Sequence, residues 1–233
     1  MPESRGTASF DEYADGYGDA VQRSIAFSGV EHDLFTRRKA RHLLDVVGRL
    51  LGPPGDVRAL DVGCGVGSTD AYLAGRLGEL EGTDVSAEAV RRAEQANPSV
   101  RYTTYPGDDL SYEDERFDLA FAICVLHHVP PAERPRFVSE LRRVVRPGGL
   151  VVVFEHNPLN PLTRLAVARC AFDGDAVLLT SRSARRMLRE GGLEPVEQRY
   201  VILVPSDRPR VVAAESVLAR LPLAAQYYIA AVR

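Results

Sequence analysis

The sequence is most informative at Leu60-Asp61-Val62-Gly63-Cys64-Gly65-Val66-Gly67-Ser68. The residues from Val57 into this stretch predict a β-strand, and residues 69–77 after it predict a helix. A strand, a glycine-rich turn and a helix form the first unit of many nucleotide-binding folds. Glycine permits positive φ and lets the backbone approach a ligand that a Cβ would block. The N–H groups at the start of the following helix would then face that ligand.

The spacing of the glycines distinguishes between cofactors. A dinucleotide-binding turn has the pattern G-x-G-x-x-G, whereas here the third glycine comes one residue early and Ser68 takes the expected glycine position. Asp61 lies two positions before the first glycine, where a carboxylate suits a cationic ligand group better than a pyrophosphate. A glycine-rich turn without any ligand would show the same local pattern. The segments that follow therefore decide whether this turn binds a cofactor.

The second predicted strand ends in an acidic residue whose spacing from the glycine turn indicates a function. Residues 79–85 form this strand, and Asp84 falls nineteen residues after Gly65. An acidic side chain about 20 residues after the glycine turn is positioned to bind ribose hydroxyls. Ser86 is then expected to cap a helix that starts at Ala87 and ends near Gln95.

Three further segments extend the alternation of strands and helices. Residues 100–104 predict a third strand, and Asp108 and Asp109 lie in the loop after it. A fourth strand starts at residue 117 and runs toward His127 and His128. Residues 141–150 predict the end of a helix and the turn into a fifth strand. Such alternation predicts a parallel, doubly wound sheet.

Taken in order, these five segments resemble the motifs of the class I S-adenosylmethionine-dependent methyltransferases over residues 10–155. The resemblance implies an α/β, Rossmann-like, doubly wound sheet of seven strands in the order 3-2-1-4-5-7-6, with the last strand antiparallel. It implies S-adenosylmethionine as cofactor and S-adenosylhomocysteine as product. It also implies that an acidic residue after strand three contacts the adenine, and that a basic residue on the preceding helix, Lys39 or Arg41, binds the donor's carboxylate. The candidate cofactor-binding residues are Tyr13, Tyr17, Lys39, Asp61, Gly63, Gly65, Asp84, Val85, Asp108, Asp109 and Cys124.

We expect residues 1–233 to form a single domain with four parts: a helical N-terminal arm (1–51), a cofactor-binding core (52–156), an insertion after strand five (157–180) and a C-terminal region (181–233). In the last part the sequence predicts a helix over residues 181–191, strands over 195–205 and 225–232, and a helix over 212–221. The arm and the insertion are expected at the carboxyl edge of the sheet, where open α/β sheets bind ligands. Both are therefore candidates for a lid. Tyr13 and Tyr17 could cover the sulfonium through cation–π contacts, or pack as part of an amphipathic helix.

The candidate catalytic residues follow strands four and five. Methyl transfer from a sulfonium needs alignment and, for a hydroxyl acceptor, a base. Successive residues of an extended segment point to opposite sides, so we expect His127 or His128 to pack inward. Glu155 could orient the adjacent His156. We favour His127 and His156 as base, with purely structural roles for these side chains as the alternative.

Composition limits the other classes of function. The 233 residues carry 29 lysines and arginines against 32 aspartates and glutamates, a net charge of -3, which argues against nucleic acid as a partner. No stretch approaches 18 apolar residues, so no membrane segment is expected, and no apolar signal-peptide core follows Met1, so we expect a cytoplasmic protein. The three cysteines lack metal-ligand spacing, so no metal is expected.

The expected function is methyl transfer to a small-molecule acceptor, at oxygen, in a bacterial secondary-metabolite or sugar pathway. Residues 155–158 and 221–227 resemble a subgroup of bacterial small-molecule methyltransferases. Carbon or nitrogen methylation, and a protein that binds S-adenosylmethionine for other chemistry, remain alternatives. A homodimer remains open beside a monomer.

Overall fold

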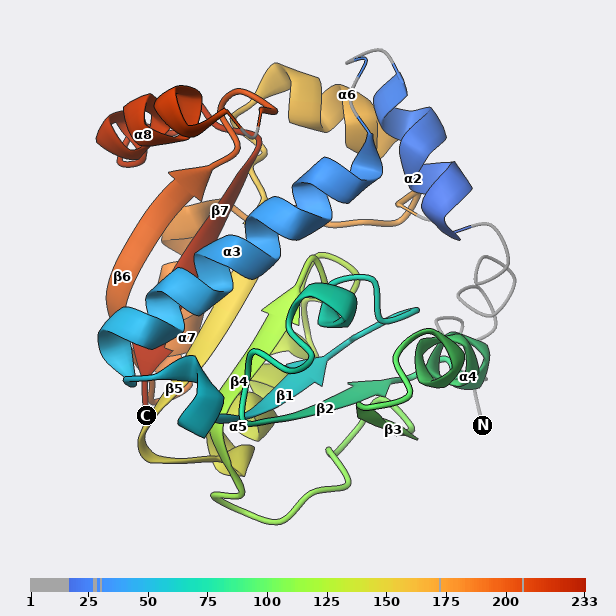
Figure 1. Cartoon of the computed structure of the whole chain (residues 1–233), viewed down its shortest axis with the longest axis vertical. Coiled ribbons are helices and arrows are strands. Elements are labelled where there is room, and N and C mark those ends of the chain that lie inside the picture. Colours follow the sequence, from blue (N-terminus) through green and yellow to red (C-terminus); the bar gives the residue numbers. More distant parts are fainter. Residues whose placement is uncertain (1–16, 27–28, 30, 172, 207) are drawn as a thin grey trace.

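The computed structural model describes residues 17–26, 29, 31–171, 173–206 and 208–233. Its seven-stranded sheet has the order β3-β2-β1-β4-β5-β7-β6 (Figure 1). β1 to β5 pair in parallel, and β7 runs antiparallel to both β5 and β6. The predicted fold class and strand order are thereby confirmed. The strands are β1 (Arg58–Val62), β2 (Glu79–Asp84), β3 (Arg101–Thr104), β4 (Phe117–Ile123), β5 (Val145–His156), β6 (Glu194–Val201) and β7 (Gln226–Val232).

Helices cover both faces of the sheet because side chains alternate along its buried strands. On β4, Leu119 and Phe121 join the apolar cluster that includes α3 (His32–Leu50) and α4 (Ala87–Ala96). Ala120 and Ala122 face the opposite cluster, with α5 (Arg134–Val144) and α7 (Ser181–Glu190). In Figure 1, α3 crosses in front of the sheet while α5 and α7 lie behind it. The period of two in a strand thus produces the two layers.

The segment after the glycine turn differs from the prediction. The helix expected over residues 69–77 is wrong, because regular structure there is limited to the 3-10 turn η4 (Asp70–Tyr72). Gly75 has φ +72°, in the left-handed region, and this interrupts any continuous helix. Asp70 is also fully buried and accepts a hydrogen bond from Tyr102 Oη at 2.9 Å, which fixes the turn against β3.

Several predicted boundaries shift at the ends of elements. The helix after β2 is confirmed, since Ser86 accepts a hydrogen bond from the Ala89 N–H as its N-cap. β6 ends at Val201, four residues before the predicted end, and the next helix, α8 (Pro209–Leu218), starts and ends about three residues early. Within the insertion, Asn160 caps α6 (Pro161–Arg169) and Pro161 opens it, because the missing N–H of proline is not needed there.

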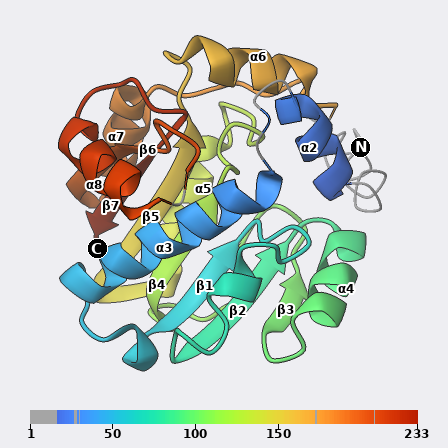
Figure 2. The same ribbon diagram turned by 45° about the horizontal axis from the view of Figure 1, so that its top comes forward.

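The arm and the insertion meet beyond the sheet. α2 (Tyr17–Ile25) lies beside α6, and Ala20, Val21 and Cys170 form a small apolar cluster between the two segments. Figures 1 and 2 both place α2 and α6 beyond the carboxyl ends of the central strands. Among the described residues no helix has the length and apolarity needed to cross a bilayer.

Candidate functional site

The loops after β1 and β4 meet where the strand order reverses. Gly63 has φ +81°, and its N–H donates to the Thr83 carbonyl of β2 at 2.7 Å. A Cβ at this position would lie 2.5 Å from Cγ2 of Val125, in the loop after β4. Glycine is therefore required for the close approach of these two loops. Ligands of open α/β sheets bind at this switch point.

Gly65 borders open space. Its φ is +54°, and no atom lies within 4 Å of the place where a Cβ would stand. At Gly67 (φ +72°), by contrast, a Cβ would meet Asn97 and Tyr102, so that glycine serves packing. The middle glycine is thus the one whose missing side chain leaves room for a ligand.

Asp84 is held in place at the end of β2. Its Oδ2 accepts from the Gly65 N–H at 2.8 Å, and its Oδ1 accepts from the Ser86 N–H at 2.9 Å. Val85 follows half-buried, 3.6 Å from the position of a Cβ on Gly107.

Asp61 and Asp70 form a buried pair of carboxyl groups beside the glycine loop. Burial, Asp70 and Asp84 together raise the pKa of Asp61 well above its usual value, while the positive charge of Lys39 acts in the opposite direction. Burial likewise raises the pKa of Asp70 to about 6. Among the described residues, Oδ1 of each of these two carboxyls has no hydrogen-bond partner. The folded protein therefore favours a proton on this pair of carboxyls, and a bound cation would instead stabilise their charged form.

Lys39 and Arg41 differ in exposure although both lie on α3. Arg41 is exposed, whereas Lys39 is buried and close enough to affect the pKa of both Asp61 and His156. Lys39 is thus the candidate that lies at the site. The acidic residues of the third loop, Asp108 and Asp109, are exposed and pair with Arg136 at 3.5 and 2.9 Å.

Two aromatic candidates cannot be placed. Tyr13 lies outside the described residues. Tyr17 is the first residue of α2, but its side chain is also outside the description. Their role over the cofactor stays a prediction.

Glu155 binds His127 and not its neighbour His156. Glu155 Oε2 lies 2.6 Å from His127 Nδ1, and Oε1 accepts from the Leu126 N–H at 2.8 Å. Both side chains are about 99% buried. The expected pairing of Glu155 with His156 is therefore wrong, because the turn after β4 brings His127 back over β5.

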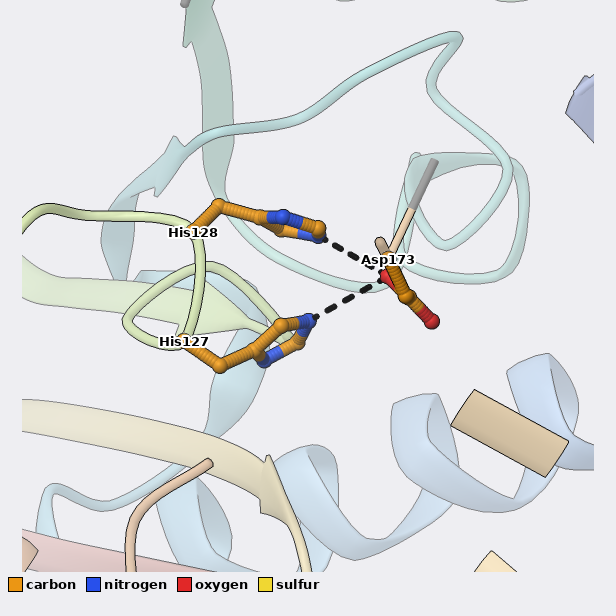
Figure 3. Close-up of side chains that lie close together, drawn as sticks. All are labelled: His127, His128 and Asp173. Carbon is orange, nitrogen blue, oxygen red and sulfur yellow. Dashed lines mark ion pairs between the residues drawn. The ribbon is translucent and has the colours of Figure 1, made fainter. Parts of the chain in front are cut away.

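The two adjacent histidines lie on the same side of the chain. Their ring centroids are 4.1 Å apart, and each Nε2 faces Oδ1 of Asp173, at 3.8 Å for His127 and 3.3 Å for His128 (Figure 3). The expectation of opposite sides is wrong because the segment is a turn, closed by a hydrogen bond from the His128 N–H to the Val125 carbonyl at 2.9 Å. His127 does pack inward, as expected of one of the pair.

The charges of this cluster determine what each ring can do. Burial opposes protonation of His127, but Glu155 and Asp173 outweigh it and raise its pKa to about 10. Contact with the imidazoles lowers the pKa of both carboxyls in spite of their burial. Burial and the charge of His127 lower the pKa of His156 to about 4. These pKa values make His127 a charged hydrogen-bond donor at neutral pH and His156 a neutral ring.

Gln226 connects this cluster to Cys124. Its Nε2 lies 3.4 Å from His156 Nδ1 and donates to Cys124 Sγ at 3.5 Å. Cys124 has φ +60°, and burial raises the pKa of its thiol. The raised pKa keeps the thiol in its neutral form, which is a poor nucleophile.

Sequence analysis missed Asp173 and Gln226. The insertion contains two aspartates, Asp173 and Asp175, and the spacing alone does not distinguish them. Asp173 reaches the histidines because the Val177 N–H donates to the His127 carbonyl at 2.9 Å, which ties the insertion to the turn after β4. Gln226 reaches His156 through the antiparallel register of β7 on β5. No sequence pattern near Asp173 or Gln226 predicts these contacts with the histidines.

Comparison with known proteins agrees with this geometry. Residues 60–153 match the family model described as a methyltransferase domain. The chain is 37% identical over 109 residues to 2-methyl-6-phytyl-1,4-hydroquinone methyltransferase of Synechocystis, an alignment that covers 45% of this chain and 33% of that protein. It is 27% identical over 163 residues to ubiquinone biosynthesis O-methyltransferase of Cereibacter sphaeroides, covering 64% and 65%.

The fold is also found among solved structures. Magnesium protoporphyrin IX methyltransferase of Synechocystis with bound S-adenosylhomocysteine superposes with a TM-score of 0.66 at 18% identity, covering 95% of this chain and 96% of that one. This likeness concerns the fold alone. The chain spans between a third and about half of the length of the curated relatives it matches first. The predicted fold is confirmed, and the predicted methyltransferase family is matched over residues 60–153.

Proposed function

We propose that this chain, whose residues 60–153 form a methyltransferase domain of the class I S-adenosylmethionine-dependent type, transfers a methyl group to an oxygen atom of a small molecule. One observation carries the proposal. The glycine turn with its surplus of buried carboxyls and the buried histidine cluster lie on loops that touch, at Gly63 and Val125. A donor bound at the first group would present its reactive end toward the second.

The residues of the glycine turn fit S-adenosylmethionine. Gly65 leaves room for a ligand against the backbone, and the Asp84 carboxylate lies directly beside it, where it would bind the ribose hydroxyls. The unsatisfied carboxyl of Asp61 suits the ammonium group of the donor, and Lys39 suits its carboxylate. When bound, S-adenosylmethionine would supply a methyl group that its sulfonium already activates.

The acceptor would lie against the histidine cluster. His127 is buried between Glu155 and Asp173, which hold its two ring nitrogens and raise its pKa, so this ring is a poor base. His128 keeps 14% of its side chain exposed and is the ring best able to contact the acceptor. A hydroxyl acceptor suits such donors and charges better than an apolar carbon. Carbon and nitrogen methylation remain the alternatives.

The arm and the insertion would close over this site. The contact of α2 with α6 supports the proposal, since both helices lie beyond the carboxyl edge and Asp173 lies four residues after the end of α6. Lids of this kind shield a reacting centre from water.

A labelled-methyl assay tests the proposal. The protein is incubated with S-adenosylmethionine carrying an isotopic methyl label and with matched phenols, hydroquinones, amines and carbon acids. We expect the label on oxygen of a phenol or hydroquinone. Label transferred only to carbon or nitrogen would correct the acceptor atom. Binding of the donor without any transfer across the panel would favour non-methyl chemistry.

A further inference from the structure

Three side chains of the histidine cluster, His127, His128 and Asp173, have the composition of a metal site. His127, His128 and Asp173 each offer one ligand atom, and these three atoms lie within 4.8 Å of one another (Figure 3). Two imidazoles and one carboxylate form the set of protein ligands found at many transition-metal sites that keep open positions.

The separations are close to those that a metal ion needs. Metal–nitrogen and metal–oxygen distances of about 2.0–2.2 Å place tetrahedral ligands roughly 3.3–3.5 Å apart. The observed separation is 3.3 Å from His128 Nε2 to Asp173 Oδ1 and 3.8 Å from His127 Nε2 to the same oxygen. The third separation, between the ligand atoms of the two histidines, is at most 4.8 Å, so the rings would have to turn to bring all three into this range.

Glu155 occupies the position of a supporting residue. A histidine that binds a metal through one nitrogen commonly donates its other N–H to a carboxylate, which fixes the ring and its tautomer. Glu155 Oε2 lies 2.6 Å from His127 Nδ1, so Nε2 faces Asp173, and a metal ion bound there would displace the Nε2 proton to solvent. Glu155 is itself fixed by the Leu126 N–H.

The backbone around the three ligands is already ordered. The Val177 N–H donates to the His127 carbonyl, and the Ala176 N–H donates to the Asp173 carbonyl at 3.1 Å. Arg134 joins both segments, with Nε donating to the Val129 carbonyl at 2.9 Å and Nη2 to the Val177 carbonyl at 2.7 Å. The ligands therefore come from two loops that are tied together before any ion is present, which lowers the entropy cost of binding.

We propose that His127, His128 and Asp173 bind one divalent transition-metal ion of the Zn²⁺, Fe²⁺ or Mn²⁺ class, with Glu155 as the residue that orients His127. The two imidazoles exclude Mg²⁺ as the preferred ion, because Mg²⁺ favours oxygen ligands. Three protein ligands leave at least one open position. If the proposed function holds, on which this last step rests, that position suits an oxygen atom of the acceptor.

Cobalt binding tests the metal site directly. The protein is dialysed against a chelator and titrated with Co²⁺, whose visible absorption reports its ligands, and with Zn²⁺ by calorimetry. We expect one equivalent of each ion to bind. Asp173→Asn, which keeps the shape of the side chain, should weaken binding at least tenfold. Asp175→Asn makes the same change at an exposed position two residues away and should leave binding unchanged.

Two further variants sharpen the result. Glu155→Gln should weaken the metal by about 10- to 100-fold, the usual effect of a supporting residue, and His128→Ala should alter the cobalt spectrum. Absence of stoichiometric binding to the wild type, or equal binding by Asp173→Asn and Asp175→Asn, would overturn the proposal and leave an ion-paired cluster. Titration of the same samples with S-adenosylhomocysteine separates the two proposals. Binding of S-adenosylhomocysteine without binding of a metal ion would refute the metal site alone. Binding of a metal ion without binding of S-adenosylhomocysteine would refute the proposed function alone.

Discussion

The two sides of the candidate site differ in how their charges are arranged. Around the glycine turn, Asp61, Asp70 and Asp84 gather with Lys39 as the cation whose charge reaches Asp61. After β4 and β5, carboxylates and imidazoles alternate, so each charge there faces an opposite one. A cationic ligand would stabilise the first arrangement, whereas in the second the carboxylates already have cationic partners and a metal ion would take the place of a proton on His127. Removing a charge should therefore have opposite effects on the two sides.

The largest effect is expected on the balanced side. His127→Ala leaves the buried Glu155 without its partner, and breaking a buried pair from one side costs about 3–5 kcal/mol of the free energy of unfolding. His156→Ala is the matched control, because the pKa of about 4 makes that ring neutral at pH 7. Urea unfolding measures both. Equal losses in the two variants would remove the charge argument.

On the other side, Asp84→Ala should act on the cofactor. We expect the affinity for S-adenosylhomocysteine to fall by about 1.5–3 kcal/mol, the range for a hydrogen bond to a charged group. Part of the loss comes from the Gly65 N–H, which would lose its acceptor. Calorimetry measures the change, and Asp45→Ala on the exposed surface of α3 is the control. An unchanged affinity would exclude Asp84 from the ribose site.

The surplus of carboxyls predicts an unusual pH dependence of stability. The pKa of Asp70 rises from 3.8 to about 6 in the folded protein, so the folded state favours its neutral form. This contribution is fully present below pH 3.8 and is lost as the pH rises through about 6. Asp70→Asn should therefore flatten the dependence of the free energy of unfolding on pH between pH 4 and 7. At pH 7 it should stabilise the ligand-free protein by on the order of 1–3 kcal/mol, because one pKa unit corresponds to about 1.36 kcal/mol. Thermal unfolding across this range measures it; a destabilised variant at pH 7 would show that the carboxylate is needed there.

The smallest effect is expected at the adenine end. Asp109 is exposed and pairs with Arg136, so it contributes little to folding. If it contacts the adenine amino group, Asp109→Ala should weaken S-adenosylhomocysteine about 2- to 10-fold through one lost hydrogen bond. Asp114→Ala, on the same connection but paired with Arg143, is the control. Identical affinities for the two variants would leave the adenine without this contact.

The same two sides differ in how far the sequence predicted them. The glycine turn, Asp61 and Asp84 lie within 25 consecutive residues, and their placement follows from two strands that are buried along almost their whole length. The conformation of a glycine and the end of a strand are local properties, so both can be predicted from the sequence. The helix over residues 69–77 failed because helical composition does not reveal the left-handed Gly75.

The histidine side depends on contacts between distant segments. His127 and Glu155 are 28 residues apart and were both named as candidates, but which histidine the carboxylate binds depends on the turn after β4. Asp173 adds a third segment, and Gln226 a fourth, through strand register. No periodicity links these four positions. The types of residue were thus predictable, and their partners were not.

The most direct test of the central claim is calorimetry of the wild-type protein with S-adenosylmethionine, S-adenosylhomocysteine and NADH. The unsatisfied carboxyl of Asp61 and the open space at Gly65 predict that both adenosyl ligands bind with one equivalent each and that NADH does not. Gly65→Val should abolish the binding of both, because its side chain would enter the open space. Binding of NADH, or no binding of either adenosyl ligand by the folded protein, would contradict the account.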